Sequence, residues 1–208
     1  IIMKKIFIII FTILFFVNSF AQEDILIKDI TKAREVENQS HWYVPDYVKI
    51  QFAGNIGLIS VGIGYDFFDS IWLSELLYGF VPASVSEAKQ IHLITSKNTF
   101  PILTRAIGKN LTISPIVGFT ATLETGNNSF LKIPDVFPGG YYITNAIHFT
   151  LFTGASFHKE FTNATIFKGA DLYFEVGTID TYLWYAITAK EIGVNDIFSS
   201  SVGINLYI

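Results

Sequence analysis

The stretch that decides the fold is SVGINLYI, residues 201–208. Val202, Ile204, Leu206 and Ile208 are apolar, and small, polar or amphipathic residues stand between them. An alternation with a period of two is the pattern of a β-strand whose two faces meet different surroundings. A soluble domain more often ends in a polar, frayed tail. We therefore expect this segment to be a strand that is hydrogen-bonded to a neighbouring strand on each side.

The same alternation runs back along the chain to Asp46 and predicts an all-β fold. Turn residues stand between the alternating segments, for example at 54–55 and 69–70. Segment 89–99 has the weakest alternation. The expected strands are 46–54, 56–68, 71–81, 89–99, 111–124, 141–158, 169–188 and 196–208. This gives eight strands if 169–188 is one strand kinked near Gly177. A break at 179–180 would give nine, and ten strands would then restore an even number.

Composition excludes several classes of protein. The chain has 208 residues, no Cys, 16% aromatic residues and a net charge of −4. It therefore forms no disulfide, no cysteine-ligated metal site and no lipidated cysteine, and it lacks the basic face that binds nucleic acid. Mean hydropathy is +0.43, yet charges are scattered beyond the first 21 residues, which excludes a polytopic helical membrane protein. The length suits one domain.

The first 21 residues resemble a cleaved secretory signal peptide. Lys4 and Lys5 precede an apolar run, 6–17, and the small-x-small sequence at 19–21 suits cleavage before Gln22. The apolar run is shorter than the roughly 20 residues of a membrane-spanning helix. Residues 1–2 precede the expected start, Met3. Residues 22–45 are the most charged segment, for which we expect a periplasmic arm or short amphipathic helix, with disorder as the alternative.

Three features favour a membrane β-barrel over a soluble sandwich for residues 46–208. The less apolar strand face is mostly Gly, Ser, Thr and Asn rather than Lys and Glu, which suits a narrow lumen. Aromatic residues gather near strand ends, as in interfacial girdles, and the strands are long enough to cross the hydrocarbon when tilted. The expected fold is a transmembrane, antiparallel, up-and-down barrel of about eight strands. Residues 201–208 would be its closing strand, paired with 46–54.

The alternation also predicts which charged side chains face the lumen. Because buried charges must be paired and hydrogen-bonded, we expect them to form a polar network that plugs the barrel. A gated proton or ion path is the alternative. The expected lumen residues are Lys49, Asp66, Glu75, His92, Glu124, His148, Asp171 and Glu175.

At its end the chain resembles small bacterial outer-membrane β-barrels of the size class of the OmpA transmembrane domain, OmpX and PagP. Ser201, Gly203, Leu206 and Ile208 match that family's assembly signal, polar-x-Gly-x-x-hydrophobic-x-hydrophobic. The Ile, Phe, Lys and Asn bias, the Ala-Gln cleavage point and the stretch LLYGFVP resemble exported barrels of the Bacteroidota. The resemblance implies a monomer in the outer membrane of a Gram-negative cell envelope. Its partners would be outer-membrane lipids, lipopolysaccharide and the barrel-assembly machinery, with no cofactor.

Candidate sites for chemistry are sparse. His148 and Thr150 share a strand face, with Glu160 downstream, which is similar to the His-x-Ser and Glu of the lipid A deacylases called PagL. Thr replaces Ser, the flanking residues differ, and the pair faces the lumen, so a lumen hydrogen-bonding role for His148 is favoured. The histidine spacing indicates no metal site.

The longest loop, 125–140, is expected on the extracellular side, where it could bind a protein or glycan. Its apolar residues are unusual for a solvated loop: Phe130, Leu131, Ile133, Val136 and Phe137. The expected function is therefore non-enzymatic, a structural or surface-interaction barrel. The alternatives are a lipid A-modifying enzyme and a narrow pore.

Overall fold

The computed structural model describes residues 43–86, 89–125, 146–162, 166–183 and 197–208. The expected signal peptide (1–21), nearly all of the arm (22–45) and the apolar residues of the 125–140 loop lie outside this part. The described elements are β1 (Tyr47–Ala53), β2 (Ile59–Phe67), β3 (Trp72–Val81), α3 (Ala83–Ser86), β4 (Ile91–Pro101), β5 (Arg105–Gly108), β6 (Leu111–Thr125), β7 (Ile147–Glu160), β8 (Gly169–Ile179) and β9 (Ser199–Tyr207).

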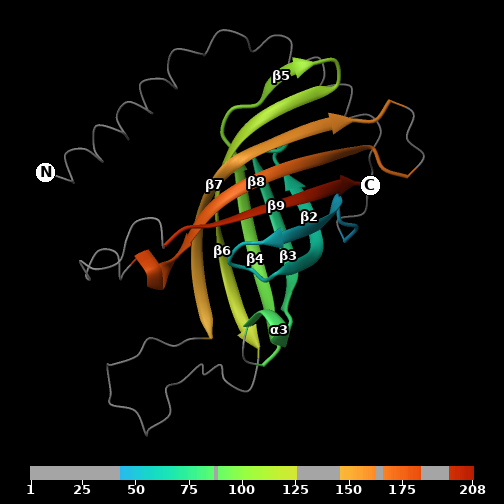
Figure 1. The fold of residues 1–208 in the computed structure, drawn as a ribbon. Helices are drawn as coiled ribbons and strands as arrows, with labels where there is room; N and C mark the ends of the chain where they lie inside the picture. Colours follow the sequence, from blue (N-terminus) through green and yellow to red (C-terminus); the bar gives the residue numbers. More distant parts are fainter. Residues whose placement is uncertain (1–42, 87–88, 126–145, 163–165, 184–196) are drawn as a thin grey trace, which may run out of the picture. The chain divides into compact units, whose positions relative to one another are not determined.

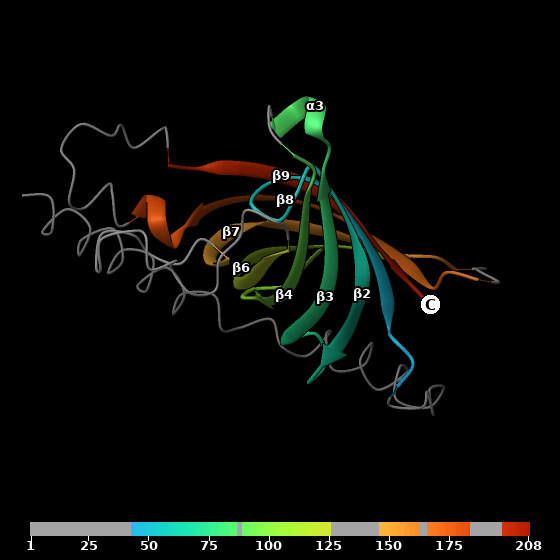
Figure 2. The same ribbon diagram turned by 90° about the horizontal axis from the view of Figure 1, so that it is seen from below.

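Eight antiparallel strands close into an up-and-down barrel, which confirms this part of the expected fold. Around the ring each strand pairs with its neighbour in chain order, except that β4 pairs with β6 rather than with β5, and β9 returns to β1 (Figure 1). The closing pair is β1 with β9, in the register Tyr47↔Tyr207 to Ala53↔Ser201. All main-chain groups in the middle of the ring can therefore pair between strands, and Figure 2 shows the same ring from below.

The structure corrects the expected strands at two places. β8 ends at Ile179, and residues 180–183 are helical, so the expected strand 169–188 does not run on past 179. The Asp180 carboxylate accepts a hydrogen bond from the Thr181 amide at 2.8 Å. This local bond gives the backbone an alternative to the strand ladder. In the connection after β4, the short strand β5 was not expected; it pairs with β6 and lies outside the closed ring.

Burial alternates along the strands, because one face points into the ring and the other outward. In β9, Ser201, Gly203, Asn205 and Tyr207 are buried while Val202 and Ile204 are exposed. In β4 the buried residues are Leu93, Thr95, Lys97 and Thr99. His92 therefore lies on the outer face of the barrel, where it hydrogen-bonds the Tyr78 hydroxyl at 2.6 Å. The expectation that His92 faces the lumen is wrong, because the register of this strand is one residue different.

The two ends of the ring carry different connections. The β1–β2 turn and α3 lie at one end, which we call the α3 end, and β5 lies at the opposite end with the start of β1 and the finish of β9 (Figure 1). Among the described residues, no helix is long and apolar enough to span a membrane.

Candidate functional site: a polar network inside the barrel

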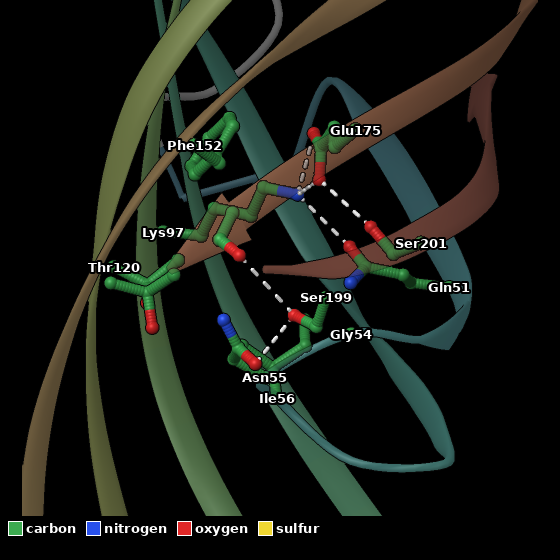
Figure 3. A pocket seen from close by; sticks show the side chains of 12 residues that line it. Gln51, Gly54, Asn55, Ile56, Lys97, Thr120, Phe152, Glu175, Ser199 and Ser201 are labelled. Carbon is green, nitrogen blue, oxygen red and sulfur yellow. Dashed lines mark hydrogen bonds and ion pairs between the residues drawn. The ribbon is translucent and has the colours of Figure 1, made fainter. Parts of the chain in front are cut away.

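Two buried ion pairs cross the interior of the barrel. The Lys49 Nζ on β1 lies 2.7 Å from Glu75 Oε1 on β3. The Lys97 Nζ on β4 lies 2.6 Å from Glu175 Oε2 and 2.8 Å from Glu175 Oε1 on β8 (Figure 3). All four residues are less than 5% exposed, at 2%, 3%, 1% and 4%. Because β4 and β8 are not neighbours in the ring, the second pair links strands across the lumen rather than along the sheet.

The ring of Tyr173 lies within reach of both ammonium groups. Its centroid is 4.1 Å from Lys49 Nζ and 5.0 Å from Lys97 Nζ, distances at which a cation is attracted to the ring face. The Tyr173 hydroxyl donates to Gln51 Oε1 at 3.1 Å, and Lys97 donates to the same oxygen at 2.9 Å. Each lysine is therefore paired with a carboxylate and packed on an aromatic ring, which is the arrangement a buried charge requires.

Glycine on the neighbouring strand provides the space for these rings. A Cβ at Gly203 would collide with the Tyr173 hydroxyl, and a Cβ at Gly64 would collide with the ring of Tyr47. Both glycines belong to the inward-facing set of their strands. The Gly residues of the polar face thus fix where the large interior side chains can lie.

A second cluster surrounds Asp171 toward the end of the ring opposite α3. The Asp171 carboxylate accepts hydrogen bonds from the Tyr207 hydroxyl at 2.7 Å and Asn205 Nδ2 at 3.0 Å, and lies 2.6 Å from His158 Nδ1. The Tyr207 ring packs on Tyr47 with centroids 5.1 Å apart, and Tyr47 donates to Glu75 at 2.8 Å. The two tyrosines therefore connect the Asp171 cluster to the Lys49–Glu75 pair.

At the α3 end, a small chamber lies beside the second ion pair. Its volume is about 20 Å³, and Figure 3 shows Lys97, Glu175, Thr120, Asn55 and Ser199 around it. The β1–β2 turn also lines the chamber, with Ile56 2% exposed and Asn55 Oδ1 accepting a hydrogen bond from Ser199 Oγ at 2.5 Å. Side chains of the described residues therefore line the interior from the Asp171 cluster to this turn, and the chamber lies beside the second ion pair.

The structure brings together four of the charged residues expected in the lumen, namely Lys49, Glu75, Asp171 and Glu175. Asp66 is half-buried and belongs to the inward-facing set of β2. Its carboxylate accepts hydrogen bonds from the Ser70 amide and hydroxyl in the β2–β3 turn, each at 2.6 Å.

Two further expected lumen residues, Glu124 and His148, are half-buried on the inward faces of β6 and β7. Neither belongs to the two lysine ion pairs. The residues of the assembly signal lie on and directly after β9, with Ser201 and Gly203 inward and Ile208 exposed.

Sequence reasoning missed Lys97, His158, Gln51 and Tyr173 as members of the network. Gln51 and Tyr173 do stand at inward positions of their alternating strands, so the period of two could have included them. His158 also alternates with the apolar residues of its strand. Lys97 could not be found in this way, because its strand has no clear alternation.

Of the three candidate catalytic residues, His148 and Thr150 share the inward face of β7, but Glu160 lies far from both. His148 and Glu160 lie at opposite ends of the continuous strand β7, which places them about 40 Å apart at roughly 3.3 Å per residue. Thr150 is buried on the inward face. Within the described ranges, no three His, Asp or Glu side chains are arranged as ligands for a metal ion. The Thr150 hydroxyl makes no hydrogen bond to His148 or to any other described residue.

Comparison of the chain with family models, with curated proteins and with solved structures finds no match. The function must therefore be inferred from the residues and geometry of the chain itself.

Proposed function

We propose that this protein is a β-barrel of the Gram-negative outer membrane, with a structural or surface-interaction role and a plugged lumen. The observation that carries the proposal is the inverted distribution of polarity. The barrel holds charged side chains inside and apolar side chains outside, whereas a soluble barrel has the opposite arrangement.

Every strand of the ring exposes large apolar side chains on its outer face. Such a surface in water would be a contiguous apolar patch far larger than the few hundred Å² usual for soluble monomers. Lipid chains would cover this surface and remove its unfavourable contact with water. Its exposed side chains include Ile50, Ile63, Leu76, Ile94, Phe119, Leu151, Phe174 and Ile204.

Aromatic side chains near the β2–β3 turn support the same proposal. Trp72 packs on Phe67 with centroids 5.0 Å apart and stacks on Phe68 and Phe100 at 6.5 Å each. Its Nε1 donates a hydrogen bond to Asn98 Oδ1 at 2.9 Å, so the indole N–H, the only polar group of this side chain, has a partner. Large rings with a satisfied polar edge suit the boundary between lipid and water.

The interior network supports a structural role over a pore or an enzyme. Ion pairs that cross the lumen leave little free cross-section, and eight-stranded barrels are narrow in any case. The separation of His148 from Glu160 argues against the deacylase-like alternative. Lipid A from a His148→Ala strain is therefore expected to be identical by mass spectrometry to lipid A from the parent.

Membrane insertion is tested directly by refolding the full chain in the presence of lipid vesicles. A folded barrel should migrate faster than the boiled sample on a gel in SDS, and its strands should resist protease only when vesicles are present. Fractionation of expressing cells should find the protein in the outer membrane. A water-soluble, vesicle-independent folded monomer would overturn the proposal.

The surface role assigned to the 125–140 loop remains a prediction, because its apolar residues lie outside the described part. Deletion of 125–140 is expected to leave heat-modifiable migration intact while abolishing capture of an extracellular protein or glycan. Unchanged pull-downs and surface phenotypes would exclude that role without affecting membrane insertion.

A further inference from the structure

Two threonines face the chamber at the α3 end with hydroxyl groups that have no protein partner among the described residues. Thr120 on β6 and Thr150 on β7 are directly paired across the sheet, are 2% and 4% exposed, and both line the chamber. Neither hydroxyl is hydrogen-bonded within the described part of the chain. A buried hydroxyl without a hydrogen-bond partner is unfavourable, and in native proteins such groups are usually hydrogen-bonded to protein or to an ordered water.

A neighbouring pair of threonines shows the contrasting arrangement. Thr95 on β4 and Thr122 on β6 are also paired across the sheet, and their hydroxyls hydrogen-bond each other at 3.0 Å. That pair needs no further partner. Thr120 and Thr150 do not bond to each other, and the space beside them is open to the chamber.

The chamber has the size and polarity that a water molecule requires. A volume of about 20 Å³ exceeds the roughly 10–15 Å³ needed to hold one water, which also needs two to four polar partners. Besides the two threonines, Gln51, Glu175, Ser199 and Ser201 line the chamber. An apolar cavity of the same size would stay dry.

We propose that the chamber binds a water molecule that bridges the hydroxyls of Thr120 and Thr150. The chamber also borders Lys97 and Glu175, so this water hydrates one side of the cross-lumen ion pair. The hydration explains how two threonine hydroxyls are tolerated beside a buried charge. This inference concerns the barrel interior and is independent of the membrane assignment.

The first test uses the full chain folded in detergent micelles and detects bound water by NMR. Cross-relaxation from a long-lived water should reach the methyl groups of Thr120 and Thr150. It should not reach the methyl group of Thr99, which is 3% exposed but does not line the chamber. Absence of cross-relaxation at Thr120 and Thr150, in a folded sample, would overturn the proposal.

The second test compares isosteric variants, because Val keeps the shape of Thr and removes its hydroxyl. Thr150→Val should lower the folding equilibrium constant about five- to tenfold, since the water loses a hydrogen bond. The matched control is Thr99→Val, whose hydroxyl also has no partner in the described part, and which should be neutral or stabilising.

The double variant then tests whether the water is shared. Once Thr150→Val has removed the bridge, adding Thr120→Val should cost little more, so the two effects should not add. Equal, neutral effects at positions 99, 120 and 150 would contradict a bound water. If a valine variant failed to fold, the cross-relaxation measurement on the unaltered chain would still decide.

Discussion

Lys97 is the residue on which most of the interior depends. Its ammonium donates hydrogen bonds to both carboxylate oxygens of Glu175 and to the amide oxygen of Gln51. The same ammonium lies 4.7 Å from the ring centroid of Phe152 and 5.0 Å from that of Tyr173. These contacts join β4 to β1 and β8 across the lumen. Loss of the ammonium would leave the Glu175 carboxylate buried without its cation.

Lys97→Ala is therefore expected to destabilise the barrel by about 3–5 kcal/mol, the usual consequence of removing one partner of a buried ion pair. The double variant Lys97→Met, Glu175→Leu removes both charges and should recover most of that loss. Urea unfolding of the protein in vesicles, followed by tryptophan fluorescence, measures the difference. Lys89→Ala, at an exposed position, serves as the control. A double variant no more stable than Lys97→Ala would show that the pair does not act as described.

At the scale of the elements, the strands were predictable where their two faces differ strongly. In β1 and β9 every second residue is apolar. The sequence therefore predicts both that these segments are strands and which of their side chains point into the barrel. In β4 the sequence HLITSKN sets polar residues on both faces, with Ser96 and Asn98 outward and Lys97 inward. No period of two indicates the register there, and a slip of one residue exchanges the faces. For this reason the sequence pattern wrongly predicts His92 in the lumen and does not identify Lys97 as a lumen residue.

The ends of strands were less predictable than their middles, because local hydrogen bonds determine them. The Asp180 side chain ends the ladder of β8, although the next residues, TYLWYAI, are as apolar as a strand. β5 forms because β6 extends beyond β4 and offers it an edge. Such tertiary pairing leaves no signal in the short segment itself.

The turn between β2 and β3 has an unusual backbone. Phe68, Asp69 and Ser70 have φ angles of 57°, 55° and 63°, a left-handed conformation that residues with a Cβ rarely adopt. Asp69→Gly removes that penalty at one position and is expected to stabilise the barrel by roughly 0.5–1 kcal/mol. Ser70 is left unchanged, since it binds Asp66. The measurement is the midpoint of urea unfolding.

A matched control for Asp69→Gly is Ser96→Gly, also at an exposed position but within a strand. There glycine only adds backbone freedom to the unfolded chain, so a destabilisation of about 0.5–1 kcal/mol is expected. If both substitutions destabilised the barrel, the left-handed conformation of Asp69 would carry no penalty that glycine removes.

At the scale of the whole molecule, the interior and the exterior impose opposite demands on neighbouring residues. In β9, Asn205 contributes a hydrogen bond to Asp171, while the adjacent Ile204 is 45% exposed on the outer face. The outer face has no protein to cover it in the described part of the ring. If lipid surrounds this face, the free-energy cost of introducing a charged side chain there should depend on the depth of the residue in the bilayer rather than on its packing against other residues.

Ile204→Arg and Ser200→Arg separate these possibilities, because both residues are exposed on the same face of β9, one in the middle of the strand and one near its start. In a bilayer, arginine costs about 2–4 kcal/mol at the midplane and about 0–1 kcal/mol near the interface. Ile204→Arg should therefore sharply reduce folding into vesicles, while Ser200→Arg should change it little. In water both arginines would be solvated, and equal behaviour of the two variants would contradict a membrane-embedded barrel. Heat-modifiable migration after refolding gives the folded fraction for each.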